Sequence, residues 1–220
     1  MEIDTRTIKN FLTDQDLDTI EKHVLATDNI HLNYNPSGED NDTEVFSGTY
    51  YLFNYYEEKN KIVKDILQPK FEAQFGKNLH IQQIHIFDSV DPYNIHSDVD
   101  SGGEFVPGHV HAWTFIIPLF DVDSHTIVFN EGSTTKQPQH YIEATPPGES
   151  LSIDDTTYKK YLSHTPHDWY RWLSIEDIFK WERGALFAAS RFKFHTSDNF
   201  LANGVKSKRA IIAWTSLPSQ

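Results

Sequence analysis

The sequence AWTFIIPLF, residues 112–120, is followed after a four-residue gap by HTIVFN, residues 125–130, and both runs are rich in β-branched and aromatic residues. Clusters of Asp, Gly, Pro and Ser separate such runs, which is the pattern of short β-strands joined by turns. Three further runs have the same character: Leu79–Phe87, Ala185–His195 and Lys208–Ser216. The sequence therefore predicts a chain that is mainly β from Leu79 onward.

Helical patterns come before these strands. Thr13 followed by Asp16 is a capping-box pattern and predicts a helix over about residues 14–26. A second helical pattern begins near Glu57, and Pro69 is expected to kink or end it. Because helices come first and strands follow, the order favours an α+β or mainly β domain over a doubly wound sheet, in which they alternate.

We expect one domain, because 220 residues can bury a sizeable core and no linker divides the chain. The stretch after the second strand pair begins with polar, Pro-rich sequence and contains two short helix starts, at Thr165-Pro166 and at Ser174. We interpret it as an insertion, or lid, over one end of a β barrel or sandwich. Residues 1–78 are predicted to form a helical support, and residues 79–130 with 181–216 a β core. Residues 131–180 are the insertion.

Composition excludes several partners. The 32 acidic against 19 basic residues give a net charge of −13, which would repel a nucleic-acid backbone. The longest apolar stretch, Phe115–Phe120, is interrupted by Pro118 and is far shorter than the ~18 residues of a membrane span. The N-terminus lacks the apolar core of a secretory signal. We expect no nucleic-acid partner, no membrane partner and a cytoplasmic location.

The absence of cysteine excludes disulfides and thiolate metal sites, whereas 12 histidines are present. Any bound metal would therefore be held by imidazoles and carboxylates. In the segment NIHSD, residues 94–98, an extended backbone would place His96 and Asp98 on one face, roughly 7 Å apart along the chain. Taken alone this pattern is weak, because a surface turn after Pro92 explains it equally well.

The downstream context adds to the pattern. An aromatic strand ends in a third candidate ligand, His195, and the final strand begins with a Lys-Arg pair. The order of His-x-Asp, distal histidine and basic residue resembles the 2-oxoglutarate and iron(II)-dependent dioxygenase superfamily, including its prolyl-hydroxylase-like and phytanoyl-like members. The resemblance covers about Leu79 to Ser216 apart from the insertion. It implies a double-stranded β-helix, a jelly-roll core of cupin-like type, flanked by helices.

The resemblance also implies an activity. The protein would be an oxidoreductase that uses Fe(II), O2 and 2-oxoglutarate, most simply to hydroxylate a C–H bond and release succinate and CO2. His96, Asp98 and His195 would be the catalytic metal ligands. Two neutral imidazoles and one carboxylate leave Fe(II) with one positive charge and open positions for the keto acid and oxygen. By analogy, the acid at position 98 disfavours halogenation, because halogenating relatives leave that site for chloride.

The far carboxylate of 2-oxoglutarate needs a cationic partner, and Arg209 is our candidate because its planar guanidinium matches a carboxylate. It follows the distal histidine by 14 positions, somewhat more than the family's usual ten or so. Lys206 and Lys208 are competitors, and strand alternation puts both on the face opposite Arg209.

Further candidates carry less weight. By the resemblance, Tyr93 and Thr126 would contact the cosubstrate. Strand alternation places Arg191 and Lys193 on the same face as the distal histidine, so one of them would face substrate or cosubstrate. The insertion supplies candidate substrate contacts at Trp169, Arg171 and Trp172.

Two alternatives stay open. His109 and His111 also share a strand face, which would suit a cupin-like metal site in an isomerase or oxygenase. A non-catalytic cupin-like or β-sandwich protein that only binds a ligand is the other alternative. The sequence leaves the primary substrate, a small molecule or an amino-acid or peptide side chain, undefined, and the oligomeric state as well.

Overall fold

The computed structural model describes residues 3–25, 33–34, 49–52, 57–99, 106–133 and 152–219. The helical elements are α1 (Asp14–Ile20) with a following π-helical turn (Glu21–Leu25), α2 (Glu57–Phe75), α3 (Asp155–Thr157), a second π-helical turn (Tyr158–Leu162) and a 3-10 turn (His167–Tyr170). The strands are β1 (Arg6–Ile8), β2 (Asn33–Tyr34), β3 (Thr49–Leu52), β4 (His80–Ser89), β5 (His109–Pro118), β6 (His125–Gly132), β7 (Ile175–Lys180), β8 (Leu186–Ser190), β9 (Lys193–Ser197) and β10 (Lys208–Pro218).

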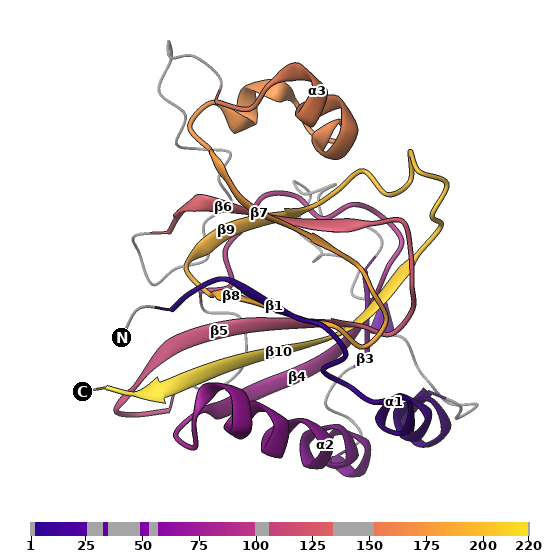
Figure 1. Ribbon diagram of the computed structural model, residues 1–220, viewed down its shortest axis with the longest axis vertical. Coiled ribbons are helices and arrows are strands. Elements are labelled where there is room, and N and C mark those ends of the chain that lie inside the picture. The colour runs from indigo at the N-terminus through magenta and orange to yellow at the C-terminus, as the bar shows by residue number, and fades with distance from the viewer. Residues whose placement is uncertain are drawn as a thin grey trace.

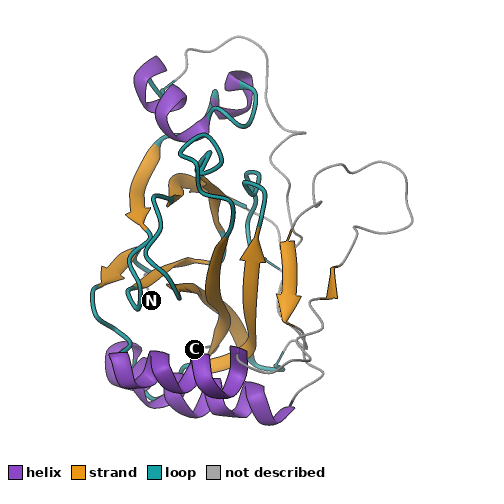
Figure 2. Ribbon diagram, turned by 90° about the vertical axis from the view of Figure 1, so that its right-hand side faces the viewer, coloured by secondary structure: helices purple, strands orange, loops and turns teal. Residues whose placement is uncertain are grey.

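These strands form two antiparallel sheets. The larger has the order β1-β8-β5-β10-β4-β3-β2, and the smaller has the order β7-β6-β9. The smaller sheet lies over one face of the larger, while α2 runs along the opposite face (Figure 1). The turned view shows α1 and α2 below the strands and the helical turns of residues 155–170 above them (Figure 2). The predicted β-rich architecture with flanking helices is confirmed.

The central strand β10 is buried on both faces. Ile211 and Ala213 face α2 and join a cluster with Phe71 of that helix, whose ring stacks 4.3 Å from the ring of Phe115. Alternate residues of the same strand face the smaller sheet and belong to a second cluster between the sheets. A strand with two apolar faces carries no sequence signal that tells its inner face from its outer face.

The first helix agrees with its prediction. The Thr13 backbone N–H donates to Asp16 Oδ2 at 2.8 Å, and the Asp16 N–H donates to Thr13 Oγ1 at 3.2 Å, which completes the capping box. The second helix differs, because α2 continues through Pro69 to Phe75. A helix-interior proline costs about 3 kcal/mol, and burial of flanking apolar residues, among them the fully buried Leu67, offsets this cost. No helix within the described ranges combines the length and apolar character needed to cross a membrane.

Two predicted segment roles require correction. Residues 1–78 are more than a helical support, because β1, β2 and β3 lie within them and join the larger sheet. The predicted insertion, residues 131–180, contains β7, so its last part belongs to the smaller sheet. The helix start predicted at Ser174 is therefore wrong, since pairing with β6 outweighs a local capping pattern. The start at Thr165-Pro166 is confirmed by the 3-10 turn, and residues 134–151 lie outside the described residues.

The predicted strand Ala185–His195 is in fact two strands in different sheets. Its first part, β8, pairs with β5 of the larger sheet, and its second part, β9, pairs with β6 of the smaller. The chain turns at Arg191 and Phe192 between them. The Arg191 carbonyl accepts a hydrogen bond from the Asp98 N–H at 3.0 Å, so this turn fixes the segment that carries two of the predicted metal ligands.

Candidate active site

The backbone brings the predicted metal ligands together. His96 lies outside regular strands, but it forms an antiparallel bridge with His195 of β9. The His96 N–H donates to the His195 carbonyl at 3.0 Å, and the His195 N–H donates to the His96 carbonyl at 2.9 Å. Two residues almost a hundred positions apart are therefore held side by side.

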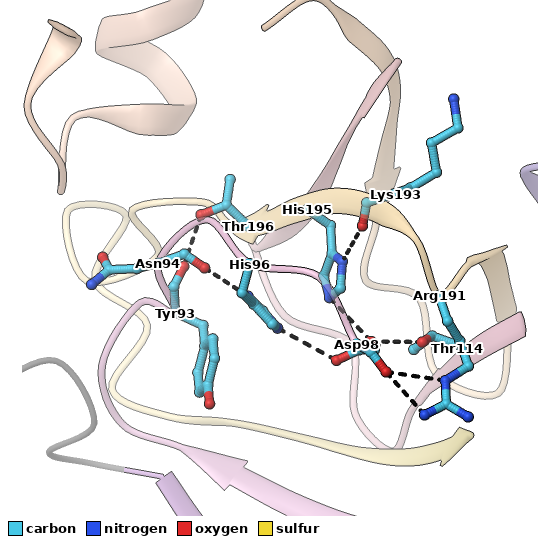
Figure 3. A network of polar contacts seen from close by, with 9 residues as sticks. All are labelled: Tyr93, Asn94, His96, Asp98, Thr114, Arg191, Lys193, His195 and Thr196. Atoms are coloured by element: carbon cyan, nitrogen blue, oxygen red, sulfur yellow. Dashed lines mark hydrogen bonds and ion pairs between the residues drawn. The ribbon is translucent and has the colours of Figure 1, made fainter. Parts of the chain in front are cut away.

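The side chains of His96, Asp98 and His195 converge on one point. Their ligand atoms all lie within 4.8 Å of one another. His96 Nε2 is 3.7 Å from Asp98 Oδ1, and His195 Nε2 is 3.4 Å from Asp98 Oδ2 (Figure 3). Among the residues that the structure describes, this is the one group of three or more metal-ligating side chains so arranged.

The imidazole tautomers suit metal binding. His96 Nδ1 lies 2.7 Å from the Asn94 carbonyl, and His195 Nδ1 lies 3.2 Å from the Lys193 carbonyl (Figure 3). Because a carbonyl only accepts, each Nδ1 carries a proton, so Nε2, which faces Asp98, is the nitrogen available to a metal. Fixing the tautomer through the second ring nitrogen is the usual arrangement of metal-ligating histidines. The donor set therefore fits Fe(II), Zn(II) or a similar divalent ion.

Asp98 is held from both its side chain and its backbone. Thr114 Oγ1 donates to Asp98 Oδ2 at 2.6 Å. The fully buried Arg191 donates from Nε and Nη2 to the Asp98 carbonyl, at 3.1 and 2.9 Å. Burial favours the neutral acid, but the His195 and His96 imidazoles and the Thr114 hydroxyl outweigh it and lower the pKa of Asp98. The residue is thus an oriented carboxylate.

Replacing Thr114 with valine should weaken ferrous-iron binding by roughly 10- to 100-fold, the usual cost of losing a group that orients a metal ligand. Valine keeps the shape of the side chain, so the fold should persist, with a lower melting temperature because the buried Asp98 carboxylate loses a hydrogen bond. Anaerobic titration with Fe(II) measures the effect. Thr19→Val is a matched control, because among the described residues the Thr19 hydroxyl bonds within its own helix, to the Gln15 carbonyl. Equal iron affinity in both variants would contradict the orienting role.

The three ligands open into a cavity of about 150 Å³ between the sheets. Tyr93 and Thr126, both predicted from the resemblance, line it. The Tyr93 ring centroid is 4.5 Å from that of His96, and Thr126 Oγ1 accepts a 2.9 Å hydrogen bond from Trp181 Nε1. The rest of the lining combines aromatic, aliphatic and small polar side chains with one lysine: Ser89, Thr114, Ile116, Trp181, Thr196, Ser197, Lys208, Ile212 and Trp214.

The structure does not bring Arg209 to this cavity. The Arg209 side chain lies on the α2-facing side of β10, where Nη2 pairs with Asp88 Oδ2. Lys208 points the other way and lines the cavity. Strand alternation correctly places Lys208 and Arg209 on opposite faces of β10. The sequence, however, predicted Arg209 on the face toward the cavity, and the structure has Lys208 there. Lys208, and not Arg209, is the cation at the site.

Lys208 is almost completely buried, with 5% of its surface exposed. Its Nζ donates to Ser124 Oγ at 3.0 Å and lies 4.2 Å from the centroid of the Trp181 ring and 4.9 Å from that of Phe200. Burial lowers the pKa of Lys208 to about 7, against an opposing effect of Asp198. The cavity therefore contains a largely desolvated amine, and a bound anion would favour its protonated form.

Two residues predicted beside the distal histidine have other roles. Arg191 is buried behind Asp98, and Lys193 extends toward solvent, where it pairs with Glu176 at 2.9 Å. The turn between β8 and β9 breaks the strand alternation on which that prediction depended.

The candidate substrate contacts do not line the cavity. Trp169 and Trp172 pack on the outer face of the smaller sheet, and Arg171 pairs with Asp168. His109 contacts Ser216 Oγ at 3.1 Å, and His111 lies near Phe192. Neither His109 nor His111 belongs to a three-ligand cluster in the described part of the chain.

Comparison with known proteins supports the fold. The non-heme α-ketoglutarate-dependent carbocyclase SnoK from nogalamycin biosynthesis matches 96% of this chain and 79% of its own, with a TM-score of 0.55 and 13% identity. The epimerase SnoN from the same biosynthesis matches 97% of the present chain and 78% of its own, with a TM-score of 0.53 and 12% identity. The structure of SnoN in complex with Fe3+, α-ketoglutarate and nogalamycin RO has a TM-score of 0.51 and 11% identity. This match covers 98% of the present chain and 81% of the SnoN chain.

No protein-family model and no curated protein matches the sequence. The solved structures therefore establish similarity of fold. The predicted resemblance to 2-oxoglutarate and iron(II)-dependent enzymes is confirmed at that level, and the residues of this chain must carry any statement about its chemistry.

Proposed function

We propose that the protein is an Fe(II)- and 2-oxoglutarate-dependent oxygenase with a double-stranded β-helix core. The observation that carries this proposal is the convergence of His96 Nε2, His195 Nε2 and the Asp98 carboxylate at a cavity that also contains the buried Lys208. The likeness to SnoN, whose structure holds Fe3+ and α-ketoglutarate, supports the same assignment.

Each residue has a separate task in this proposal. The two imidazoles and the carboxylate hold the metal on one side, while Thr114 holds the Asp98 carboxylate and Arg191 holds the Asp98 backbone carbonyl. Bound ferrous iron would supply oxygen activation coupled to the oxidative decarboxylation of 2-oxoglutarate. Lys208 pairs with the far carboxylate of the cosubstrate, and Thr126, which lines the same cavity, contacts it. Tyr93 covers the metal beside His96.

The reaction we propose is hydroxylation of an unactivated C–H bond in a small molecule or in an amino-acid or peptide side chain. One oxygen atom enters the substrate and the other enters succinate, and CO2 leaves, so 2-oxoglutarate supplies two of the four electrons that reduce O2. The apolar part of the cavity wall, which includes Ile116, Ile212 and Trp214, suits the hydrocarbon part of such a substrate and excludes water.

The decisive experiment is cosubstrate turnover. We expect the protein, loaded anaerobically with Fe(II) and 2-oxoglutarate and then exposed to O2, to form succinate even without its primary substrate, at a slow rate. His96→Ala should abolish this. If 2-oxoglutarate binds but no succinate forms with any C–H substrate tested, the protein is a binding protein. If His111→Ala rather than His96→Ala removes the metal, the alternative His109 and His111 site is correct.

A further inference from the structure

A chain of buried polar groups leads away from the cavity behind Lys208. Its Nζ donates to Ser124 Oγ at 3.0 Å, and Ser124 Oγ donates in turn to Asp198 Oδ1 at 2.7 Å. The second oxygen of that carboxylate, Asp198 Oδ2, lies 3.0 Å from His125 Nδ1. Ser124 and Asp198 are both fully buried. Of these four residues, Lys208 alone was a candidate in the sequence analysis.

These hydrogen bonds and charges offset the free-energy cost of burying the Lys208 ammonium. Moving an ammonium from water to a protein interior is unfavourable unless a counter-charge and hydrogen bonds replace its hydration. Asp198 supplies the counter-charge and Ser124 supplies the hydrogen bond. The Trp181 and Phe200 rings add cation–π contacts.

We infer that Ser124 and Asp198 are positioning residues that hold Lys208 at the cavity wall as an ammonium, ready to pair with the carboxylate of an anionic cosubstrate. The inference rests on the proposed function for the identity of that anion. An ammonium has three N–H donors, and the bond to Ser124 uses one of them. Because Asp198 acts through the Ser124 hydroxyl, its oxygens do not occupy the position that an incoming carboxylate would take.

Other titratable groups around Lys208 are few in the described structure. His125, at the start of β6, forms a hydrogen bond with Asp198. His164 is close enough to Asp198 and Lys208 to interact electrostatically with both. Burial lowers the pKa of His164 to about 4, so it stays neutral near pH 7. Asp198 raises the pKa of Lys208 against the effect of burial. This direction is the one expected for a carboxylate joined to the amine through the Ser124 hydroxyl.

The test compares cosubstrate binding in wild type and Asp198→Asn. Asparagine keeps the shape and can still accept from Ser124, but it removes the counter-charge, so Lys208 should lose its proton at lower pH. If its pKa falls by about one unit, the affinity for 2-oxoglutarate at about pH 8 should fall roughly tenfold. Near pH 6, where the amine is roughly nine-tenths protonated in wild type and about half protonated in the variant, the difference should shrink to roughly twofold. Anaerobic calorimetry with Mn(II) in place of Fe(II) measures both affinities without turnover.

Two further measurements keep the result interpretable. Asp123→Asn removes a neighbouring carboxylate that is exposed, and this variant should bind like wild type at every pH. The ¹⁵N signal of Lys208 Nζ reports its titration directly and needs neither metal nor cosubstrate. Ser124→Ala, which removes the bridging hydroxyl, should shift that titration in the same direction as Asp198→Asn and provides the test if the latter fails to fold.

The outcomes separate the two proposals. If wild type binds 2-oxoglutarate through Lys208 but Asp198→Asn, or Ser124→Ala in its place, keeps the wild-type pH profile and Nζ titration, the positioning role is wrong and the proposed function stands. If wild type binds no 2-oxoglutarate, both are wrong. A loss of affinity in Asp198→Asn that is equal at about pH 6 and about pH 8 would show a purely structural role and would also overturn the inference.

Discussion

Replacing His195 with alanine is expected to abolish tight binding of ferrous iron while the protein still folds. In the proposed metal centre His195 would supply one of three ligand atoms, and its Nε2 lies 3.4 Å from Asp98 Oδ2. Loss of a group that merely orients a ligand costs roughly 10- to 100-fold in affinity, so loss of the ligand itself should exceed roughly 100-fold. Succinate formation should disappear with the iron. Anaerobic Fe(II) titration measures the affinity.

The fold should survive this substitution because the His195 main chain, and not its imidazole, forms the bridge to His96. Circular dichroism and the melting temperature of the metal-free protein provide this check. His111→Ala is the matched control, since it removes an imidazole of β5 that lies outside the ligand cluster. Iron retention in His195→Ala together with loss in His111→Ala would exclude the metal centre assigned here.

The sequence predicted which three candidate ligands converge more reliably than it predicted their surroundings. His96 and Asp98 were inferred as neighbours on an extended segment, and the distal ligand was inferred from its place at the end of an aromatic strand. The structure joins these positions by a single two-residue bridge and not by a continuous strand. The order of the motifs indicates which residues meet. It does not predict the turn at Arg191, where the chain passes from the larger sheet to the smaller one.

The long-range parts of the fold were the hardest to predict. Strand β7 was hidden because its residues, Ile175–Lys180, follow a capping pattern and because its partner β6 lies more than forty positions earlier. Strand β1 is only three residues long and pairs with β8 near the other end of the chain. Local patterns carry no information about such pairings, which depend on tertiary packing.

The error at Arg209 has a specific physical origin. Strand alternation correctly placed Lys208 and Arg209 on opposite faces, but both faces of β10 are apolar, because α2 covers one and the smaller sheet covers the other. The preference for arginine followed the chemistry of carboxylate recognition. A clue was nevertheless present, since Lys208 shares its face with Trp214, a residue large enough to form part of a cavity wall.

Replacing Lys208 with methionine should therefore weaken 2-oxoglutarate binding much more than replacing Arg209 does. Methionine retains an unbranched apolar chain against the Trp181 and Phe200 rings but has no charge. Removing one member of a buried, hydrogen-bonded charge pair costs about 2–5 kcal/mol, which corresponds to a loss of affinity of roughly 30-fold or more. Iron affinity should be unchanged, because Lys208 is outside the ligand cluster.

Arg209→Ala is the control for this experiment and tests the face assignment directly. It breaks the pair with Asp88 on the α2-facing side of the sheet. This pair is mostly buried, so we expect a stability loss of roughly 1–3 kcal/mol and no change in cosubstrate affinity. Anaerobic calorimetry with Mn(II) and 2-oxoglutarate compares the two variants. If affinity fell in Arg209→Ala and persisted in Lys208→Met, β10 would present its other face to the cosubstrate, and the cavity described here could not be the cosubstrate site.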